Sequence, residues 1–328
     1  MGDFTPTQKH FALLGASGYV APRHMRAILE TGQKLLAAYD PFDSVGIIDR
    51  YFPEADFFTE FERFDRHIEK LRRRGTKTDF VSVCSPNYLH DAHCRFGMRA
   101  GTDVICEKPL VLNPWNLDAL QEIEQETGKC IFPILQLRYH PTVVALKDHV
   151  DNASKGDIFD ITLTYLTSRG KWYHASWKGN QSMSGGIATN IGIHFFDILL
   201  WIFGNVRDNI VYQHSHDRAS GYLILDRARI KWFLSIDGSI RVDKGHALIA
   251  PPYRSLVLGD EQFDFTEGFE NLHTRSYEKI LRREGFSLAD SRPAIQLAHD
   301  IRNATLHQTD QNTHPLADNV KRKHPFDR

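Results

Sequence analysis

Short apolar runs that end in glycine, serine or charged residues recur through the first 135 residues. The runs span 10–14, 35–39, 80–84, 104–106 and 131–135. Helical patterns lie between them, at 22–30 and at 114–127, where Asn113-Pro114 is a helix start and Gly128 a stop. Strands alternating with helices predict parallel βαβ units, whose ligands bind at the carboxyl ends of the strands.

The pattern changes after about residue 150. Alternating polar and apolar positions predict strands of a largely antiparallel sheet at 158–166, 221–225, 229–235, 253–258 and 262–265. Helical stretches follow at 269–284 and 291–305, and we expect the polar last twenty or so residues to be extended or mobile. The sequence therefore predicts an α/β dinucleotide-binding domain, residues 1–135, and a substrate-binding and oligomerisation α+β domain, residues 136–328.

Composition narrows the class of protein. The chain has 328 residues, of which 41% are hydrophobic, enough for two domains with cores of their own. Lys and Arg total 40 against 41 Asp and Glu, so neither a nucleic acid nor a membrane surface is an expected partner. Four cysteines without a Cys-x-x-Cys pair, and no apolar signal core before His10, favour reduced thiols in the cytoplasm.

The loop after the first predicted strand is a candidate cofactor site. It reads Gly15-Ala16-Ser17-Gly18-Tyr19-Val20 and opens a helix. Glycine lets the backbone approach a pyrophosphate, and the helix N-terminus offers unpaired N–H groups and the positive end of its dipole. The spacing has one residue more between the first two glycines than the G-x-G-x-x-G pattern, so its place after a strand carries the argument.

Asp40 is the candidate acid for the adenosine ribose. It ends the second predicted strand, 25 residues beyond Gly15. A 2′-phosphate held at about 4 Å from this carboxylate would meet a repulsion of about 4 kcal/mol at an effective dielectric of about 20. Since no arginine follows Asp40 directly, the sequence predicts NAD rather than NADP.

Lys108 and His194 are the candidate catalytic residues. Lys108 follows the apolar run at 104–106 and is fixed by Pro109; His194 is predicted on the first turns of an amphipathic helix, with Asn190 on the same face. Oxidation of an alcohol by NAD needs a proton acceptor, which an imidazole near neutrality supplies, and a cation that favours the developing alkoxide. Asp197 could orient the imidazole or bind another group.

Residues 168–178 form a second candidate region. They collect Arg169, Lys171 and Lys178 with three aromatic side chains in a loop-like stretch, which suits an anionic, sugar-bearing substrate. The alternative is a surface loop anchored by its tryptophans. His214-x-His216 lies in a polar stretch with no nearby cysteine or acidic cluster, so we predict no metal site there.

These motifs together resemble the Gfo/Idh/MocA oxidoreductase family. The motifs are the Gly15 loop, Ser85-Pro-Asn-x-x-His90, Glu107-Lys108-Pro109 and the Gly-Gly…Gly192-x-His194-x-x-Asp197 segment. Within that family the chain resembles the UDP-N-acetylglucosaminuronate 3-dehydrogenases, the WlbA/WbpB group. The segments that carry this closer resemblance are Gly-Tyr-Val-Ala-Pro-Arg-His24, Ala38-Tyr-Asp-Pro41, Ser44-Val-Gly-Ile-Ile-Asp49 and Trp172-Tyr-His-x-Ser-Trp-Lys-Gly179.

The resemblance implies a Rossmann domain plus a domain built on an open-faced sheet, through which tetramers form. It implies oxidation of the C3 hydroxyl of a UDP-sugar uronate on a route to bacterial surface polysaccharide (O-antigen), with 2-oxoglutarate regenerating NAD in some members. Carried over by position, Lys108 and His194 are the catalytic pair and Glu107 holds the nicotinamide ribose. Other cofactor contacts implied are Ser44, Ser85, Asn87, His90, Lys108 itself and Gln136.

The expected substrate contacts are Lys108, Arg169, Lys171, Tyr173, Asn190 and His194. Many family members have aspartate at the position of Asn190, so this chain has one acid/base candidate fewer. The residues leave open whether Lys108 or His194 takes the proton. Two other functions remain as alternatives: a dehydrogenase of another sugar or inositol, and a nucleotide-sensing protein without turnover.

Overall fold

The computed structural model describes residues 8–243, 248–259, 261–265, 268–317 and 323–327. The chain divides into two compact units. The first comprises the residues up to Gln136 together with Glu270–Ser291, and the second comprises Leu137–Phe269 with the residues from Arg292 onward. We predicted one domain boundary, after residue 135. That prediction did not include residues 270–291 in the first unit, where the structure places them.

The first unit is built on a six-stranded parallel sheet in the order β3-β2-β1-β4-β5-β6. Its strands are β1 (His10–Leu14), β2 (Lys34–Tyr39), β3 (Asp56–Phe58), β4 (Phe80–Val83), β5 (Asp103–Cys106) and β6 (Ile131–Pro133). Fully buried strands of this kind explain the continuous apolar runs of the sequence. The order reverses between β1 and β4, which is where a doubly wound sheet binds ligands.

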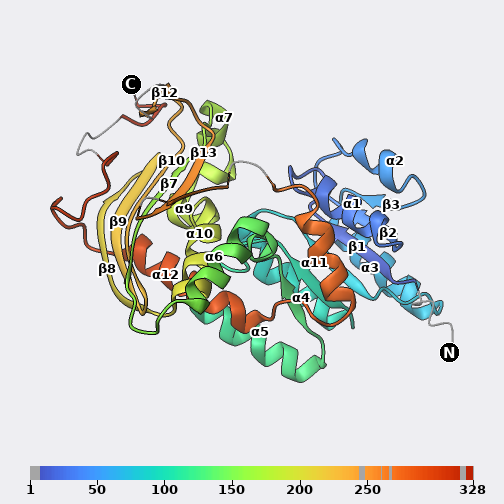
Figure 1. Ribbon diagram of the computed structural model, residues 1–328. Helices are drawn as coiled ribbons and strands as arrows, with labels where there is room; N and C mark the ends of the chain where they lie inside the picture. The colour runs from blue at the N-terminus through green and yellow to red at the C-terminus, as the bar shows by residue number, and fades with distance from the viewer. Residues whose placement is uncertain (1–7, 244–247, 260, 266–267, 318–322, 328) are drawn as a thin grey trace. The chain divides into compact units, whose positions relative to one another are not determined.

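Helices cover this sheet. They are α1 (Ala21–Glu30), α2 (Ile47–Tyr51), α3 (Phe61–Arg73), α4 (His90–Arg99), α5 (Pro114–Thr127) and α11 (Leu272–Leu281). Helix α11 packs beside α1 (Figure 1). There Arg26 Nη2 donates to Asn271 Oδ1, although the two residues are 245 positions apart in the chain. Its Tyr277 stacks on Phe11 of β1 with ring centroids 5.7 Å apart, so α11 is part of this unit's core.

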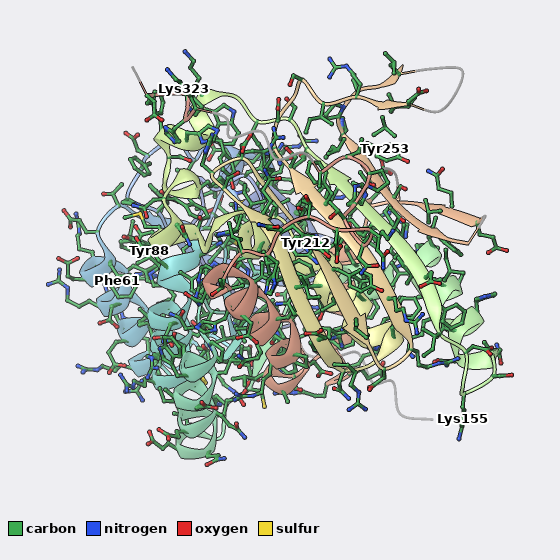
Figure 2. All side chains as sticks on the ribbon, turned by 90° about the vertical axis from the view of Figure 1, so that its left-hand side faces the viewer. Phe61, Tyr88, Lys155, Tyr212, Tyr253 and Lys323 are labelled. Carbon is green, nitrogen blue, oxygen red and sulfur yellow. The ribbon has the colours of Figure 1, made fainter. Side chains whose placement is uncertain are left out.

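The second unit is built on a mixed sheet in the order β14-β13-β7-β10-β9-β8. Its strands are β7 (Phe159–Leu166), β8 (Val206–His214), β9 (Arg218–Leu225), β10 (Ala228–Ser235), β13 (Tyr253–Leu258) and β14 (Glu261–Asp264). Only the β7–β10 pair is parallel among these neighbours, so the predicted largely antiparallel sheet is confirmed. Tyr212 on β8 and Tyr253 on β13 mark this sheet in Figure 2.

Helices of the second unit pack on one face of this sheet. They include α6 (Pro141–Asn152), α7 (Lys171–Ala175), α8 (Gln181–Ser184), α9 (Gly186–Asn190) and α10 (Ile193–Phe203), and α12 (Leu288–Asn303) follows near the end of the chain. Phe196 of α10 meets Trp232 of β10 edge-on at 5.4 Å between ring centroids. Most residues of α10 are buried, so this is a core helix and the prediction of an amphipathic one was wrong.

The C-terminal segment crosses the other face of the same sheet. His314 lies 2.9 Å from Thr164 Oγ1 and stacks on Phe233, and Tyr212 donates to Asp310 at 2.6 Å. Leu316 joins the apolar cluster of Leu166, Phe233 and Tyr253. We expected a polar tail that is extended or mobile; its residues up to 317 instead include turns and are held by side-chain contacts.

Among the described residues no single helix is both long and apolar enough to cross a membrane. One bent pair, Gln181–Asn190 with Ile193–Phe203, passes that test by length and composition, with a bend of 47°.

Candidate active site

The Gly15 loop lies at the reversal point of the first sheet. The N–H groups of Gly15 and Ala16 both donate to the Tyr39 carbonyl, at 2.8 and 3.2 Å, so the loop is tied to the end of β2. Gly15 has φ +91°, and a Cβ there would come within 2.5 Å of Ser85 N at the end of β4. Only glycine can occupy this position, because both the backbone conformation and the close approach exclude a side chain.

Asp40 is buried beneath this loop. Its Oδ2 accepts from the Ser17 N–H and its Oδ1 from the Phe42 N–H, both at 3.0 Å, and the residue is 5% exposed. The carboxylate therefore holds the backbone on both sides of the predicted ribose site. Three other predicted cofactor contacts lie within a few residues of this loop or of Asp40. Ser44 and Tyr19 are exposed, and Val20 is the N-cap of α1.

The Gly15 loop and a buried amide fit NAD. The loop presents backbone N–H groups ahead of α1, with glycines where a pyrophosphate must approach closely. Gln136 is 5% exposed, and its Oε1 is buried without a hydrogen-bond partner among the described residues. An unpaired buried amide oxygen is costly unless a ligand pairs with it, and a nicotinamide carboxamide supplies the matching donor.

The Ser85-Pro-Asn-x-x-His90 segment is internally bonded. Ser85 Oγ lies 2.8 Å from His93 Nδ1, and the two ring nitrogens of His90 lie 2.8 Å from the Ser85 carbonyl and 2.7 Å from the Pro109 carbonyl. Burial lowers the pKa of His90, and hydrogen bonds to these two carbonyls oppose the shift. His90, predicted to line the cofactor, thus joins the end of β4 to the turn after Lys108. Asn87 lies on the one-turn helix between them and is buried.

Lys108 and Glu107 follow β5, as predicted, but face different surroundings. Lys108 is half-buried, whereas Glu107 is 4% exposed and both its oxygens accept from protein donors. The carboxylate of Glu107, whose predicted ligand is the nicotinamide ribose, lies in the interior of the unit against His24 and His273.

In the second unit, two predicted substrate contacts lie together. Asn190 Nδ2 donates to the Tyr173 hydroxyl at 2.8 Å, which joins α9 to α7. Burial raises the pKa of Tyr173, so its hydroxyl stays protonated at neutral pH. The stretch 168–178 is not a loop throughout, because it contains the short helix α7. The structure thus brings these two predicted contacts together.

Three cationic residues belong to the same stretch of chain as Tyr173. Lys178 lies over the rings of Trp177 and Trp172, at 4.3 and 5.9 Å from their centroids, and burial with the charge of Arg169 lowers its pKa. Lys171 is exposed, and Arg169 donates to the Ser168 carbonyl. The tryptophans therefore serve as a stacking platform for a lysine, which the sequence pattern did not indicate.

His194 stands on the first turn of α10. Asp197, a candidate partner for its imidazole, forms a buried bidentate ion pair with Arg138, at 2.7 and 3.0 Å. The glycines ahead of His194 have separate tasks. Gly185 takes φ +81° after α8, and Gly192 lets the backbone pass Leu234 of β10, where a Cβ would come within 2.6 Å of the leucine.

His216 gathers two other imidazoles that sequence reasoning did not connect with it. The ring centroids of His174 and His324 lie 5.5 and 4.9 Å from its own. Burial lowers the pKa of His174 and of His216, and mutual repulsion between the rings acts in the same direction. His214 lies beside Gly186 instead, so the two histidines of the His214-x-His216 stretch have different neighbours.

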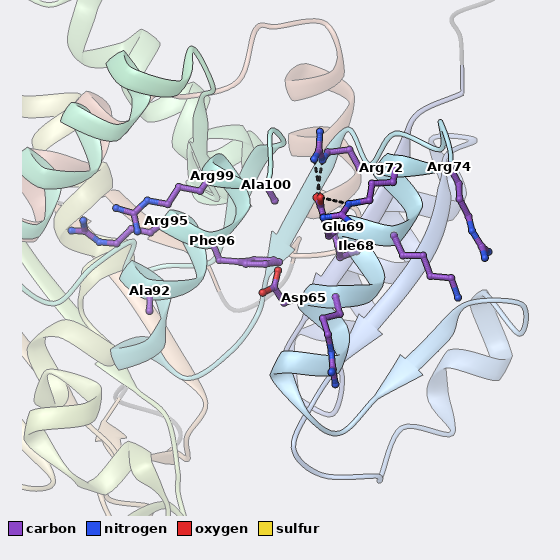
Figure 3. A pocket seen from close by; sticks show the side chains of 13 residues that line it. Asp65, Ile68, Glu69, Arg72, Arg74, Ala92, Arg95, Phe96, Arg99 and Ala100 are labelled. Atoms are coloured by element: carbon purple, nitrogen blue, oxygen red, sulfur yellow. Dashed lines mark hydrogen bonds and ion pairs between the residues drawn. The ribbon is translucent and has the colours of Figure 1, made fainter.

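A groove of about 950 Å³ opens between α3 and α4 (Figure 3). Its lining is rich in arginine, and Arg72 and Arg73 both donate to Glu69 at 2.8 Å. The lining contains none of the predicted site residues, so this groove is distinct from the strand ends that carry the Gly15 loop. The lining residues are Asp65, Arg66, Ile68, Glu69, Lys70, Arg72, Arg73, Arg74, Ala92, Arg95, Phe96, Arg99 and Ala100.

Both units match one family of known proteins. Residues 9–134 match the oxidoreductase family, NAD-binding Rossmann fold, and residues 147–249 match the oxidoreductase family, C-terminal alpha/beta domain. The chain belongs to the Gfo/Idh/MocA oxidoreductase family. As a member of this family of NAD-dependent dehydrogenases it uses NAD, and the predicted fold class is confirmed.

Relatives within the Gfo/Idh/MocA family differ in how much of the chain they match. The WlbA (WbpB) dehydrogenase from Thermus thermophilus, solved with NAD and UDP-GlcNAcA, is 44% identical, with a TM-score of 0.89 over 94% of this chain and 100% of that one. D-glucoside 3-dehydrogenase from Escherichia coli is 29% identical over 44% of this chain and 41% of its own length. Inositol 2-dehydrogenase from Rhizobium meliloti is 27% identical over 59% of this chain and 54% of its own length. The chain thus spans about half the length of these curated relatives.

Proposed function

We propose that the protein oxidises the C3 hydroxyl of UDP-N-acetyl-D-glucosaminuronic acid to the 3-keto sugar with NAD. The observation that carries this proposal is the likeness to the Thermus thermophilus enzyme along the whole of that enzyme's chain, since that enzyme was solved with this sugar nucleotide and NAD. The same enzyme was also solved with α-ketoglutarate. We therefore propose 2-oxoglutarate as the oxidant that regenerates NAD, in a cytoplasmic homotetramer of O-antigen biosynthesis.

The proposed chemistry gives Lys108 and His194 separate tasks. NAD, when bound, supplies the hydride acceptor. We expect His194 to take the proton of the C3 hydroxyl and Lys108 to donate a hydrogen bond to the oxygen as its charge develops. The C3–H bond breaks as the carbonyl forms, and the substrate loses a hydride and a proton in total. Arg169, Lys171 and Lys178 are expected to face the anionic groups of the substrate, beside the Tyr173–Asn190 pair.

A substrate panel tests this proposal. The purified protein is first analysed by mass spectrometry for bound cofactor, and NADH absorbance is then followed with UDP-N-acetylglucosaminuronate, with the sugar uronate lacking UDP, with a glucoside and with inositol. We expect turnover with the UDP-sugar uronate alone, and loss of the absorbance of bound NADH on addition of 2-oxoglutarate. Turnover of inositol or the glucoside, without that of the UDP-sugar, would refute the substrate assignment.

A second candidate is oxidation of a free sugar or an inositol. It is favoured by the curated relatives, which include a glucoside 3-dehydrogenase and an inositol 2-dehydrogenase. The glucoside and inositol members of the same panel test it directly. A nucleotide-sensing role predicts NAD binding with no hydride exchange on any member of the panel.

The catalytic pair is tested by substitution. We expect Lys108→Ala and His194→Asn each to lower kcat by about a hundredfold or more, while Kd for NAD changes little, because both groups act on the substrate oxygen. Lys34→Ala and His149→Asn are matched controls, since both residues are exposed. Steady-state kinetics and NAD titration give the result, and wild-type turnover in both variants would refute the pair.

A further inference from the structure

A chain of buried polar side chains crosses the interior of the first unit and ends at Glu107. Ser82 Oγ lies 2.7 Å from the Tyr277 hydroxyl, which lies 2.8 Å from His24 Nδ1. His24 Nε2 lies 3.0 Å from Glu107 Oε1, and His273 Nε2 lies 2.9 Å from the same oxygen. None of the five residues is more than 5% exposed.

One arrangement of hydrogens satisfies every group in this chain. A carboxylate oxygen can only accept, so both imidazoles must donate to Oε1 through Nε2. A neutral His24 then offers the lone pair of Nδ1, which accepts from the Tyr277 hydroxyl, and that hydroxyl accepts from Ser82. All donors therefore point toward Glu107.

The electrostatics agree with this arrangement. Burial alone would raise the pKa of Glu107, but the hydrogen bonds from His24 and His273 outweigh it and hold the pKa well below its usual range. Burial lowers the pKa of His24. Glu107 is therefore ionised at neutral pH.

The second oxygen of Glu107 connects this cluster to Lys108. The backbone N–H of Lys108 donates to Oε2 at 3.1 Å. On the other side of Lys108, the Pro109 carbonyl lies 2.7 Å from His90 Nδ1, and the other ring nitrogen of His90 faces the Ser85 carbonyl at the end of β4. Buried side chains thus hold the backbone before and after the lysine.

The same three residues could in principle hold a metal ion. One ligand atom from each of His24, Glu107 and His273 lies within 4.8 Å of the others. However, both imidazoles lie at hydrogen-bond distance from one oxygen, and every donor of the chain has an acceptor without an ion. Protons therefore account for the geometry, and metal content becomes an outcome of the test.

We propose that Glu107, held by His24 and His273, is a positioning residue that sets the backbone of Lys108. This inference rests on the catalytic role of Lys108 proposed above. It also assigns a task to α11, because this helix brings His273 and Tyr277 to a site formed by residues far earlier in the chain. Glu107 then acts through Lys108 and makes no contact with the dinucleotide.

The first test is Glu107→Gln, which keeps the size of the side chain but replaces an acceptor with an amide donor. We expect kcat to fall about ten- to hundredfold, because one protein donor loses its acceptor, while Kd for NAD stays within about threefold. A ribose contact predicts the opposite split, a Kd raised tenfold or more with kcat little changed. That result would overturn the proposal.

A pair of variants at His273 separates positioning from general loss of structure. His273→Gln keeps an N–H donor and is expected to retain most of the turnover, whereas His273→Leu removes the donor and is expected to behave like Glu107→Gln. Lys279→Ala, on the exposed side of the same helix, is the matched control. Equal activity of the Gln and Leu variants would contradict the proposal.

Two measurements do not depend on turnover. Hydrogen exchange at the Lys108 amide is expected to accelerate at least about tenfold in Glu107→Gln and His273→Leu, because its acceptor is lost or displaced. Metal analysis of the purified wild type is expected to find no stoichiometric ion, and a stoichiometric ion released by a chelator would overturn the proposal.

If wild type turns over no substrate but the exchange result holds, the proposed function fails while the positioning of the Lys108 backbone stands. Unchanged exchange in an active enzyme refutes the inference alone.

Discussion

Asp40 bonds to two backbone segments around the cofactor loop. Its two oxygens accept from Ser17 and Phe42, so the carboxylate fixes the Gly15 loop against the turn after β2. The sequence predicts a ribose ligand at this position and, from its charge, selectivity for NAD. The structure adds a second, supporting role for Asp40. Its carboxylate is only 5% exposed and accepts from two backbone N–H groups, so it also stabilises the loop.

Replacing Asp40 tests that support role. We expect Asp40→Ala to weaken NAD binding by about ten- to hundredfold, since two charge-assisted hydrogen bonds are lost, and to narrow the preference for NAD over NADP, because the repulsion of a 2′-phosphate is removed. Asp43→Ala, at an exposed neighbouring acid, is the control. Titration with both dinucleotides measures the two effects, and a variant that binds NAD as tightly as wild type would contradict the support role.

Neighbours along the chain do not reveal the partners of a buried acid. Glu107 stands beside Lys108 in the sequence and was expected at the ribose, yet its imidazole partners come from α1 and from α11. His273 lies 166 positions away, and no local spacing signals a contact of that range. Buried polar atoms must find partners, so the fold chooses them from whichever helices pack there.

The turn between α9 and α10 controls where His194 stands. A Cβ on Gly192 would come within 2.6 Å of both the Ala188 carbonyl oxygen and Leu234 Cδ1, so the helix pair can approach β10 only with glycine at this position. The motif glycines of the sequence therefore serve packing, and they place the histidine indirectly.

Gly192→Ala is expected to destabilise the second unit by about 1–3 kcal/mol, because the added methyl overpacks a rigid contact. We also expect a lower kcat, since His194 is two residues further along. Gly156→Ala is the matched control, because a Cβ there meets no atom within 4 Å. Thermal unfolding and steady-state kinetics measure the two effects, and a Gly192 variant as stable as the control would exclude the packing argument.

Both units contain histidines that are buried in the neutral form. Burial lowers the pKa of His93 in the first unit to about 4 and that of His314 in the second to about 3, from an ordinary value of 6.5. His314 receives the Leu316 N–H on Nδ1, so Nε2 donates to Thr164 and the neutral ring satisfies both contacts. A proton added to either ring favours the unfolded chain.

The sign of the pH dependence follows. Between the ordinary and the lowered pKa the unfolded chain binds more protons, so the free energy of unfolding rises with pH there. We expect full stability above about pH 6.5 and a loss on the order of a few kcal/mol as pH falls toward 4, measured by denaturant unfolding. The His314→Gln variant is expected to have a lower free energy of unfolding at pH 7.5, and that free energy is expected to fall less steeply as the pH decreases. An unchanged pH dependence would contradict this.

Local pattern alone determined much of this protein. Period-2 and period-3.6 apolar spacing, with glycine and polar residues at strand ends, predicts the parallel sheet, the largely antiparallel sheet and the positions of the Gly15 loop, Asp40 and Lys108, because these signals depend on residues close together in the chain. The return of α11 to the first unit, the partners of Glu107, the ion pair of Asp197 and the gathering of His174 with His216 and His324 came from the folded chain. These contacts join residues distant in sequence, and packing of whole elements selects them.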